Sequence, residues 1–251
     1  MAPSARTAIR TVPTVTAACL LAAAAAGCAV TTTQQKDDWL TVKAERTLVK
    51  SDKVKVAAPD PDVEVTDATI VRGDKETAFS VALENTGDQP VNDLPIAVGV
   101  KGGGDEPLNL TKGASYFEAH IGALAAGESG TWVFVTKDDV PEGEPFAKVG
   151  EQADPPLTVA ETLPAVDVSQ TGTADGKDGG TVDLQVSNSS GVPQYDLEIF
   201  ATATKGGKVV AAGTATLDDL ETGDSHPVKL ALVGDPKGAQ VDVFAPPTIF
   251  K

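Results

Sequence analysis

The sequence contains few residues of the kinds that usually carry catalysis or metal binding. Among 251 residues there are two cysteines, two histidines and one methionine, and only 4% are aromatic. His120 and His226 are far apart, and neither has a second metal-type ligand at a suggestive spacing. Gly-x-Ser-x-Gly, His-Glu-x-x-His and phosphate-cradling glycine loops are missing. We therefore expect no catalytic activity, no cofactor and no metal site.

Two further patterns hold reactive residue types without the spacing that their chemistry needs. Asp224-Ser225-His226 has the composition of a hydrolase triad, but adjacent turn residues cannot align those side chains in a hydrogen-bonded line. Acidic clusters offer oxygen ligands for calcium, but none matches an EF-hand loop, and we interpret them as solvated turns. These clusters are Asp60-Pro-Asp62, Asp175-Gly-Lys-Asp178 and Asp218-Asp219.

Positive charge is scarce in most of the chain. From Pro59 to Lys251 there are 32 acidic residues and 12 lysines and arginines, which gives this segment a net charge of −20 against −16 for the whole chain. A body this acidic repels nucleic acid and anionic lipid head groups. The segment from Ala29 to Ala58 differs, with six basic and four acidic residues. We expect no nucleic-acid partner.

Charge is absent altogether between Thr11 and Val30. The residues before this stretch include Arg6 and Arg10 but no acid. Its apolar part, Val15 to Ala26, is shorter than the ~20 residues of a membrane-spanning helix. A positive start followed by an apolar core of this length is typical of an export signal.

Small residues and a cysteine end this stretch, as Ala25-Ala26-Gly27-Cys28. They resemble the lipobox of a bacterial lipoprotein signal, although Ala25 stands where a branched aliphatic residue is usual. The resemblance covers only the first residues, and it implies that 1–27 are removed and that Cys28 is lipidated. Cys19 would be discarded with the signal, so the mature protein would have no internal disulfide. Such an anchor implies a place at the extracytoplasmic face of the cell membrane.

Two other interpretations of the N-terminal segment compete with lipid attachment. An ordinary signal peptide, cut near an Ala-x-Ala-like site, would release a freely secreted protein. An uncleaved membrane helix would need Thr11 to Thr16, including Pro13, to be counted in the span. A lone mature cysteine at position 28 favours lipid attachment over both.

Residues 28–50 are polar, and we expect them to form a short tether. Helix and strand both fit part of this segment. The two patterns are helical spacing at Trp39, Leu40, Ala44 and Leu48, and alternation from Leu40 to Ala44.

The body contains an internal repeat. Val81–Val98 aligns without a gap with Leu184–Ala201 at an offset of 103, and Leu124–Ser129 matches Leu220–Ser225 at an offset of 96. The first copy therefore has seven extra residues, which fall most naturally in the glycine-rich loop Lys101–Gly113. Identical pairs in the longer block are Asn85 and Asn188, Pro90 and Pro193, Asp93 and Asp196, Leu94 and Leu197, and Ile96 and Ile199.

Both copies alternate apolar and polar residues with the period of a β-strand. Turn residues separate the alternating runs, as at Asn85-Thr-Gly87 and Lys205-Gly206-Gly207. Trp132 could stack on a sugar if it were exposed, but its alternation with Phe134 indicates that it points into the core. The pattern predicts an all-β fold of two tandem immunoglobulin-like β-sandwiches after the signal peptide and tether.

The repeated motifs also support a family comparison. The first copy has an apolar-x-apolar-x-Asn-x-Gly strand end, and both copies have a later Leu-x-x-Gly-(Glu/Asp)-Ser turn. Together these resemble bacterial Ig-like adhesion modules and FxLYD-type modules of envelope proteins. The second copy is closer to the FxLYD kind through Tyr195–Phe200 and Gly207-Lys-Val-Val-Ala, but it has Thr202-Ala-Thr204 in place of the Leu-Tyr-Asp run. The resemblance implies a scaffold and says little about a ligand.

The boundaries follow from the repeat. We expect sandwich 1 at 51–150, a proline-containing linker at 151–156 and sandwich 2 at 157–251. The expected function is non-catalytic: a lipid-anchored envelope protein that presents its domains to an envelope protein or glycan. The Lys101–Gly113 loop is the first candidate for a binding site because only one copy has it. The alternatives are a purely structural spacer and a secreted carbohydrate-binding or hydrolase-accessory protein.

Overall fold

The computed structural model describes residues 56, 58–110, 114–151, 163–176 and 179–248. The predicted signal peptide 1–27, the tether 28–50 and all of the linker 151–156 except Glu151 lie outside this part. The described residues form β-strands joined by turns, with no helix among them and therefore none that could span a membrane. This confirms the all-β prediction.

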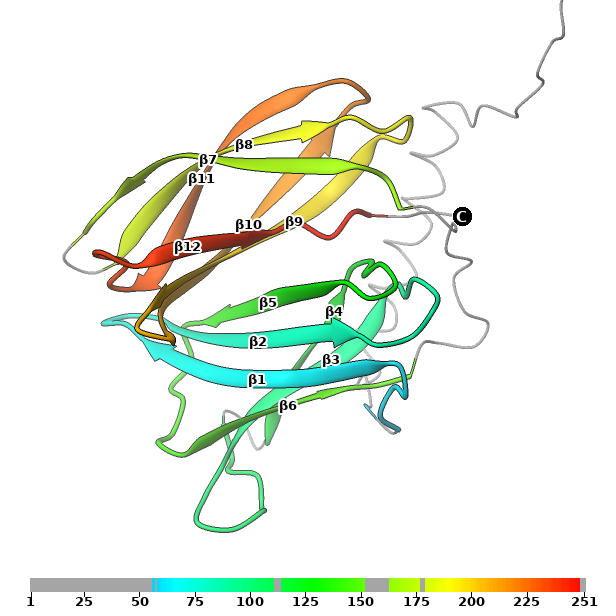
Figure 1. Ribbon diagram of the computed structural model, residues 1–251. Coiled ribbons are helices and arrows are strands. Elements are labelled where there is room, and N and C mark those ends of the chain that lie inside the picture. The colour runs from blue at the N-terminus through cyan, green and yellow to red at the C-terminus, as the bar shows by residue number, and fades with distance from the viewer. Residues whose placement is uncertain (1–55, 57, 111–113, 152–162, 177–178, 249–251) are drawn as a thin grey trace, which may run out of the picture. The chain divides into compact units, whose positions relative to one another are not determined.

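Twelve strands follow one another along the described chain (Figure 1). They are β1 (Val63–Arg72), β2 (Thr77–Asn85), β3 (Leu94–Lys101), β4 (Tyr116–Ile121), β5 (Ser129–Thr136), β6 (Glu144–Val149), β7 (Val166–Ala174), β8 (Gly180–Asn188), β9 (Gln194–Lys205), β10 (Lys208–Leu220), β11 (Ser225–Gly234) and β12 (Gln240–Phe244).

Strands β1 to β6 form two antiparallel three-stranded sheets with the orders β1-β2-β5 and β4-β3-β6. The period-two apolar side chains of the central strands are buried in one cluster, so the two sheets face each other across it. Members from β2 and β3 are Phe79, Val81, Leu83, Leu94, Ile96, Val98 and Val100.

Strands β7 to β12 repeat this pairing order. They form one sheet, β12-β9-β10-β11-β8-β7, in which β10 and β11 pair at only two positions. On either side of that junction, β7-β8-β11 corresponds to β1-β2-β5 and β10-β9-β12 corresponds to β4-β3-β6. The repeat extends to backbone detail, since Asp93 and Asp196, 103 residues apart, both have left-handed φ angles of 56° and 45°. A second buried cluster lies between the two parts of this sheet.

The two copies differ most at one hairpin. Strands β9 and β10 are joined by Gly206 and Gly207 alone, whose φ angles of 59° and 76° suit a tight type I′ turn. Strands β3 and β4 are instead joined by residues 102–115. The extra residues of the first copy therefore lie in this connection.

Asn85, at the end of β2, explains one of the repeated sequence motifs. Its side chain is fully buried, and its Nδ2 donates hydrogen bonds to the carbonyl oxygens of Gln89 (2.9 Å) and Leu124 (3.1 Å). Its Oδ1 accepts a hydrogen bond from the backbone N–H of Gly87 (3.0 Å). One amide side chain thus ties the end of β2 to its own turn and to the turn before β5.

Asn188 makes the same three bonds at the end of β8. Its Nδ2 donates to the carbonyl oxygens of Val192 (2.9 Å) and Leu220 (3.1 Å), and its Oδ1 accepts from the backbone N–H of Ser190 (3.0 Å). Asparagine provides the two donors and the acceptor that this position needs. The repeated asparagine is therefore a structural feature of the fold.

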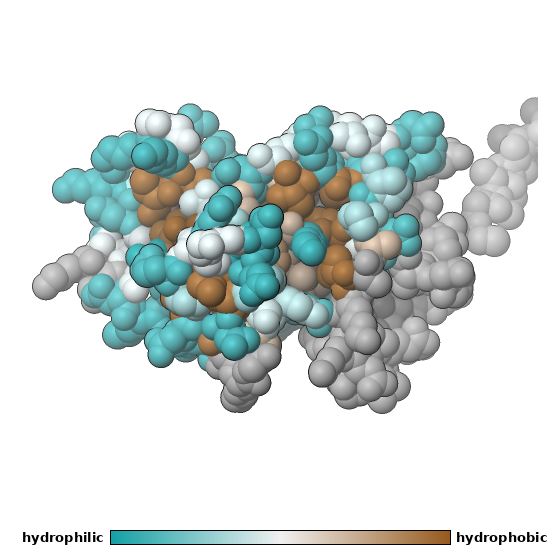
Figure 2. Space-filling view, turned by 90° about the horizontal axis from the view of Figure 1, so that it is seen from below, coloured by the Kyte–Doolittle hydropathy of each residue, from teal (hydrophilic) through white to brown (hydrophobic). Residues whose placement is uncertain are grey.

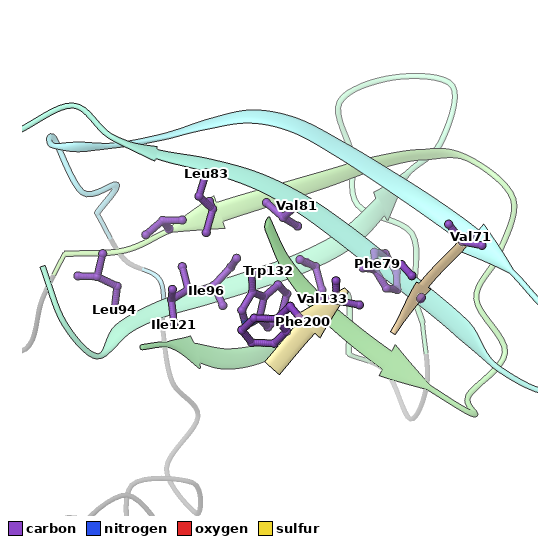
Figure 3. Close-up of a cluster of buried hydrophobic side chains, with 14 of the residues drawn as sticks. Val71, Phe79, Val81, Leu83, Leu94, Ile96, Ile121, Trp132, Val133 and Phe200 are labelled. Carbon is purple, nitrogen blue, oxygen red and sulfur yellow. The ribbon is translucent and has the colours of Figure 1, made fainter. Parts of the chain in front are cut away.

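The few aromatic residues are concentrated in one chain of contacts. Consecutive ring centroids are 5.0 to 6.4 Å apart, within the usual range for aromatic pairs. The rings, in order of contact, are those of Phe79, Phe117, Phe134, Trp132, Phe200 and Phe244. Trp132 is 2% exposed, which confirms its predicted place in the core. Figure 3 shows Phe200, from β9, beside Trp132, from β5.

Phe200 belongs to the outer face of its sheet. Leu197, Ile199 and Ala201 of β9 lie in the second cluster, whereas Phe200 points the other way and lies in the first cluster with Ala212 and Val233. Side chains from β9, β10 and β11 thus complete a core that is otherwise built from β1 to β6.

The surface of the first copy that faces the second copy is lined with small residues. Ala78 and Ser80, on the outer face of β2, are buried. These small residues allow close approach between the outer face of β1-β2-β5 and that of β10-β9-β12. Gly130 of β5 opposes Leu83 and therefore lies on the other, core-side face, where an added Cβ would lie 2.6 Å from the ring of Phe244.

Candidate functional site

The lipidation candidate, Cys28, lies outside the described residues. The Lys101–Gly113 loop is described up to Leu110. Its backbone is tied by hydrogen bonds from Leu108 N–H to the carbonyl oxygen of Val100 (2.7 Å) and from Leu110 N–H to that of Ala114 (2.7 Å). Leu108 and Leu110 pack against the first core. The loop therefore holds its own base in place and exposes residues 103–107.

Lys101 connects this loop to the neighbouring sheet face. Its Nζ lies 3.2 Å from Oδ1 of Asp105, in the loop, and 6.0 Å from the ring centroid of Phe146, on β6. The second contact has the geometry of a cation–π interaction. The loop and the outward side chains of β6 thus form one continuous surface.

That sheet face is centred on Gly99, in the middle of β3. Gly99 pairs with Tyr116 on one side and with Phe146 on the other, and directly opposed residues project from the same face. An added Cβ at Gly99 would lie 2.7 Å from two carbons of the Phe146 ring, so this ring covers the glycine. Phe117 and Ala147, the next residues along, pack on the core.

We call this surface the Tyr116–Phe146 face. It consists of the outward residues of the sheet β4-β3-β6, which are Pro95, Ala97, Gly99, Lys101, Tyr116, Glu118, His120, Glu144, Phe146 and Lys148. Figure 2, viewed from below Figure 1, looks toward the side where β3 and β6 lie and shows apolar surface broken up by polar residues. Tyr116, at 41% exposure, is the only large hydrophobic side chain classed as exposed in the described part of the chain.

The two histidines are not in equivalent places. His120 Nδ1 lies 3.1 Å from Oδ1 of Asp93 and 3.3 Å from its carbonyl oxygen, so it holds the turn before β3. His226 is exposed on β11. The Ser225 hydroxyl next to it accepts a hydrogen bond from Gln185 Nε2 (2.7 Å). Asp224, Ser225 and His226 are therefore not aligned in the hydrogen-bonded arrangement of a catalytic triad.

The acidic clusters lie in the described part of the chain, apart from Asp178. Within the described ranges, no group of three His, Cys, Asp or Glu side chains is placed to hold a metal ion. Oδ1 of Asp60 accepts a hydrogen bond from the backbone N–H of Asp62 (2.9 Å), which is the role of a turn residue. An open hollow of about 480 Å³ is lined by turn residues of mixed charge, including Arg72, Asp74 and Lys237.

Sequence reasoning placed the candidate site in the loop and missed the adjoining face. The alternation around β3 and β4 was visible, but which residue opposes which depends on the register across a connection of 14 residues, 102–115. The available signal was Gly99 itself, because a glycine inside a strand often marks close approach by another group.

Tyr195 provides a prediction about pH. Burial, with smaller contributions from Glu221 and Asp219, raises the pKa of its phenol above the ordinary value near 10. Above about pH 10 the unfolded chain loses this proton more readily than the folded chain, so the free energy of unfolding is expected to fall. Tyr195→Phe should reduce this alkaline decline, measured by urea unfolding from pH 8 to 12. Tyr116→Phe, at an exposed ring, should keep it, and an unchanged decline in Tyr195→Phe would contradict the prediction.

Comparisons with known proteins give no family for this chain. No family model matches the sequence, and no curated protein matches it. Among solved structures, the chain is similar to the crystal structure of the YadV chaperone, with 12% sequence identity over 73% of this chain and 99% of that one. The TM-score is 0.19, which is too low to bear on fold or function.

Proposed function

We propose that this protein is a non-catalytic lipoprotein of the cell envelope, anchored through Cys28, that presents a binding surface to an envelope protein or glycan. The observation that carries the proposal is the N-terminal sequence, in which Arg6 and Arg10 precede an uncharged stretch that ends in Ala25-Ala26-Gly27-Cys28. Two or more acyl chains on one residue give stable membrane attachment. The tether 28–50 would separate the folded part from the bilayer.

We also propose that the folded part is a pair of tandem immunoglobulin-like sandwiches. Support comes from the pairing order that occurs twice, β1-β2-β5 with β4-β3-β6 and β7-β8-β11 with β10-β9-β12. The buried asparagines Asn85 and Asn188, with matching hydrogen bonds, support the same conclusion.

A structural spacer is the second candidate. The contact between Trp132 and Phe200 favours it, because shared packing of this kind resists bending between the two copies. A spacer would tolerate substitution of its exposed side chains, whereas a binding protein is sensitive at one patch.

The anchor is tested by cell fractionation and by mass spectrometry of the mature N-terminus. In the wild type, we expect an acylated Cys28 in the membrane fraction. Cys28→Ser should leave the chain unprocessed or move it out of that fraction. Cys19→Ser is the matched control, because it alters only the predicted signal core, and it should behave as the wild type. An unmodified N-terminus in the medium would contradict the anchor and favour a secreted protein.

A further inference from the structure

We propose that residues 245–248, which follow β12, form a strap that locks the two copies of the repeat together and that opens without unfolding either copy. This goes beyond the proposed function, because it concerns how the folded part holds its shape. Three observations support it. Two prolines turn the segment away from its sheet, the segment contacts both copies, and the two copies differ at the residues that make these contacts.

The prolines end the pairing of β12 with β9. In the first copy, the residues after β6 continue to pair, since the N–H groups of Gly150 and Glu151 donate to backbone carbonyl oxygens (2.8 and 3.1 Å). At the offset of 96, β6 corresponds to β12, and these two positions are taken by Pro246 and Pro247. Proline has no N–H to donate. The strand therefore ends at Phe244, and the segment leaves the sheet.

The segment contacts the first copy just after β4. Ala123 donates a hydrogen bond from its backbone N–H to the carbonyl oxygen of Pro247 (3.4 Å). At the neighbouring Gly122, an added Cβ would lie 3.1 Å from Cβ of Pro246, so the glycine leaves room for the proline ring. Ala123 and both prolines are buried, so this end of the strap is packed against the first copy.

Gln194, at the start of β9, holds the same segment to the second copy. Its side chain is fully buried, and its Oε1 accepts hydrogen bonds from the N–H (2.7 Å) and the hydroxyl (3.1 Å) of Thr248. The backbone N–H of Tyr195 donates to the same hydroxyl (3.3 Å). Because a buried amide oxygen is costly to leave without donors, Gln194 favours the closed strap.

The two copies differ at the residues that contact the segment. Gln194 and Val91 occupy the same place in the repeat, each paired with the leucine that begins the Leu-x-x-Gly turn. The valine offers no side-chain acceptor. At the other contact, Gly122-Ala123 corresponds at the offset of 96 to Asp218-Asp219, which has larger, charged side chains. Each copy thus carries the residues for one end of the strap.

The strap can open more easily than the strands around it. It is held at its two ends, whereas the strands on either side contribute to large buried clusters. Segments with few buried contacts open locally at a lower free-energy cost than a core does. An open strap would leave the copies held by their shared core around Trp132 and Phe200. The strap therefore provides a way to loosen the pair while each copy stays folded.

The test is hydrogen–deuterium exchange of the full-length protein in detergent micelles, followed by mass spectrometry with residue-level fragmentation. The reporters are the amides of Ala123, on the first copy, and of Tyr195 and Thr248, on the second. Thr248→Val removes a hydroxyl on the second copy and should raise exchange at Ala123 about tenfold. Gly122→Val, on the first copy, should displace Pro246 and raise exchange at Tyr195 and Thr248 by a similar factor.

Two controls make the same chemical changes away from the strap. Gly103→Val adds a side chain at a glycine where an added Cβ would have nothing within 4 Å, and Thr216→Val replaces an exposed threonine of β10. Both should exchange as the wild type at the reporters. In every variant, the amides of Val81 in β2 and Val186 in β8 should stay protected, because both residues lie in the cores.

Two results would overturn the inference. The first is wild-type exchange at the reporters of the unaltered copy in both Thr248→Val and Gly122→Val, which would mean that the segment does not couple the copies. The second is a rise at Val81 and Val186 as large as that at the reporters, which would make the segment an inseparable part of the cores. Neither result depends on whether Cys28 is acylated, so the strap and the proposed anchor can fail separately.

Discussion

Phe200→Ala is expected to lower the free energy of unfolding by about 3 to 5 kcal/mol, the usual cost of removing a buried phenylalanine ring. Phe200 is 1% exposed and contacts both Trp132 and Phe244, so its loss leaves a cavity between the two copies. The surrounding strands belong to different sheets, so the cavity can close only if these sheets shift toward each other. The effect is measured by urea unfolding followed by circular dichroism.

The same variant should change the form of the transition as well as its midpoint. With Phe200 present, the two copies share a core, and we expect them to unfold together in one transition. With alanine there, the transition should broaden or divide in two. Tyr116→Ala removes an exposed ring and is the matched control, expected to stay within about 0.5 kcal/mol of wild type. An unchanged midpoint in Phe200→Ala would show that the contact contributes no stability.

Asn85→Asp is expected to cost a similar amount, about 3 to 5 kcal/mol, although it changes hardly any volume. The Nδ2 group of Asn85 donates to two carbonyl oxygens, and a carboxylate cannot donate to either. The substitution leaves those carbonyls without this donor and places a charge in a buried site. Asn188→Asp should behave alike, because Asn188 makes the corresponding bonds.

Asn109→Asp is the control for this pair. It makes the same chemical change at an exposed position of the loop after β3, and it should leave the midpoint of urea unfolding within about 0.5 kcal/mol of wild type. A small effect in Asn85→Asp, comparable to that of the control, would mean that the repeated asparagine does not stabilise the strand ends.

The sequence predicted the features of this fold that depend on local pattern. Period-two alternation in β2 and β3 indicated which side chains face inward, because successive residues of a strand point to opposite sides. The repeat at an offset of 103 identified Asn85 and Asn188 as equivalent, and the structure gives both the same hydrogen bonds.

Contacts made by the outer faces could not be obtained in this way. In β9 the alternating residues Leu197, Ile199 and Ala201 fit one buried face, and Phe200 is the apolar residue out of phase with them. An out-of-phase aromatic residue shows that the other face is covered too, but it does not identify the partner. That partner, Trp132, lies 68 residues earlier and is selected by the packing of two sheets.

The candidate binding face was hidden for a related reason. Tyr116 and Phe146 are 30 residues apart and come together only because each opposes Gly99. Their alignment depends on strand register, which follows from the two connections and from the core on the opposite face. Neither contribution can be inferred from the residues near Tyr116 alone.

The small residues on the outer face of β2 also affect how this protein can change over generations. Ala78 lies in one buried cluster with Val133 of β5 and with Ala212 and Val233 of the other copy. A deletion that removed either copy would uncover an apolar patch on the remaining one, and such patches promote aggregation. Once two copies of a domain have hidden surface on each other, the loss of one harms the other. The pair is then inherited or lost as a whole, and each copy is free to diverge only on the faces that it does not share.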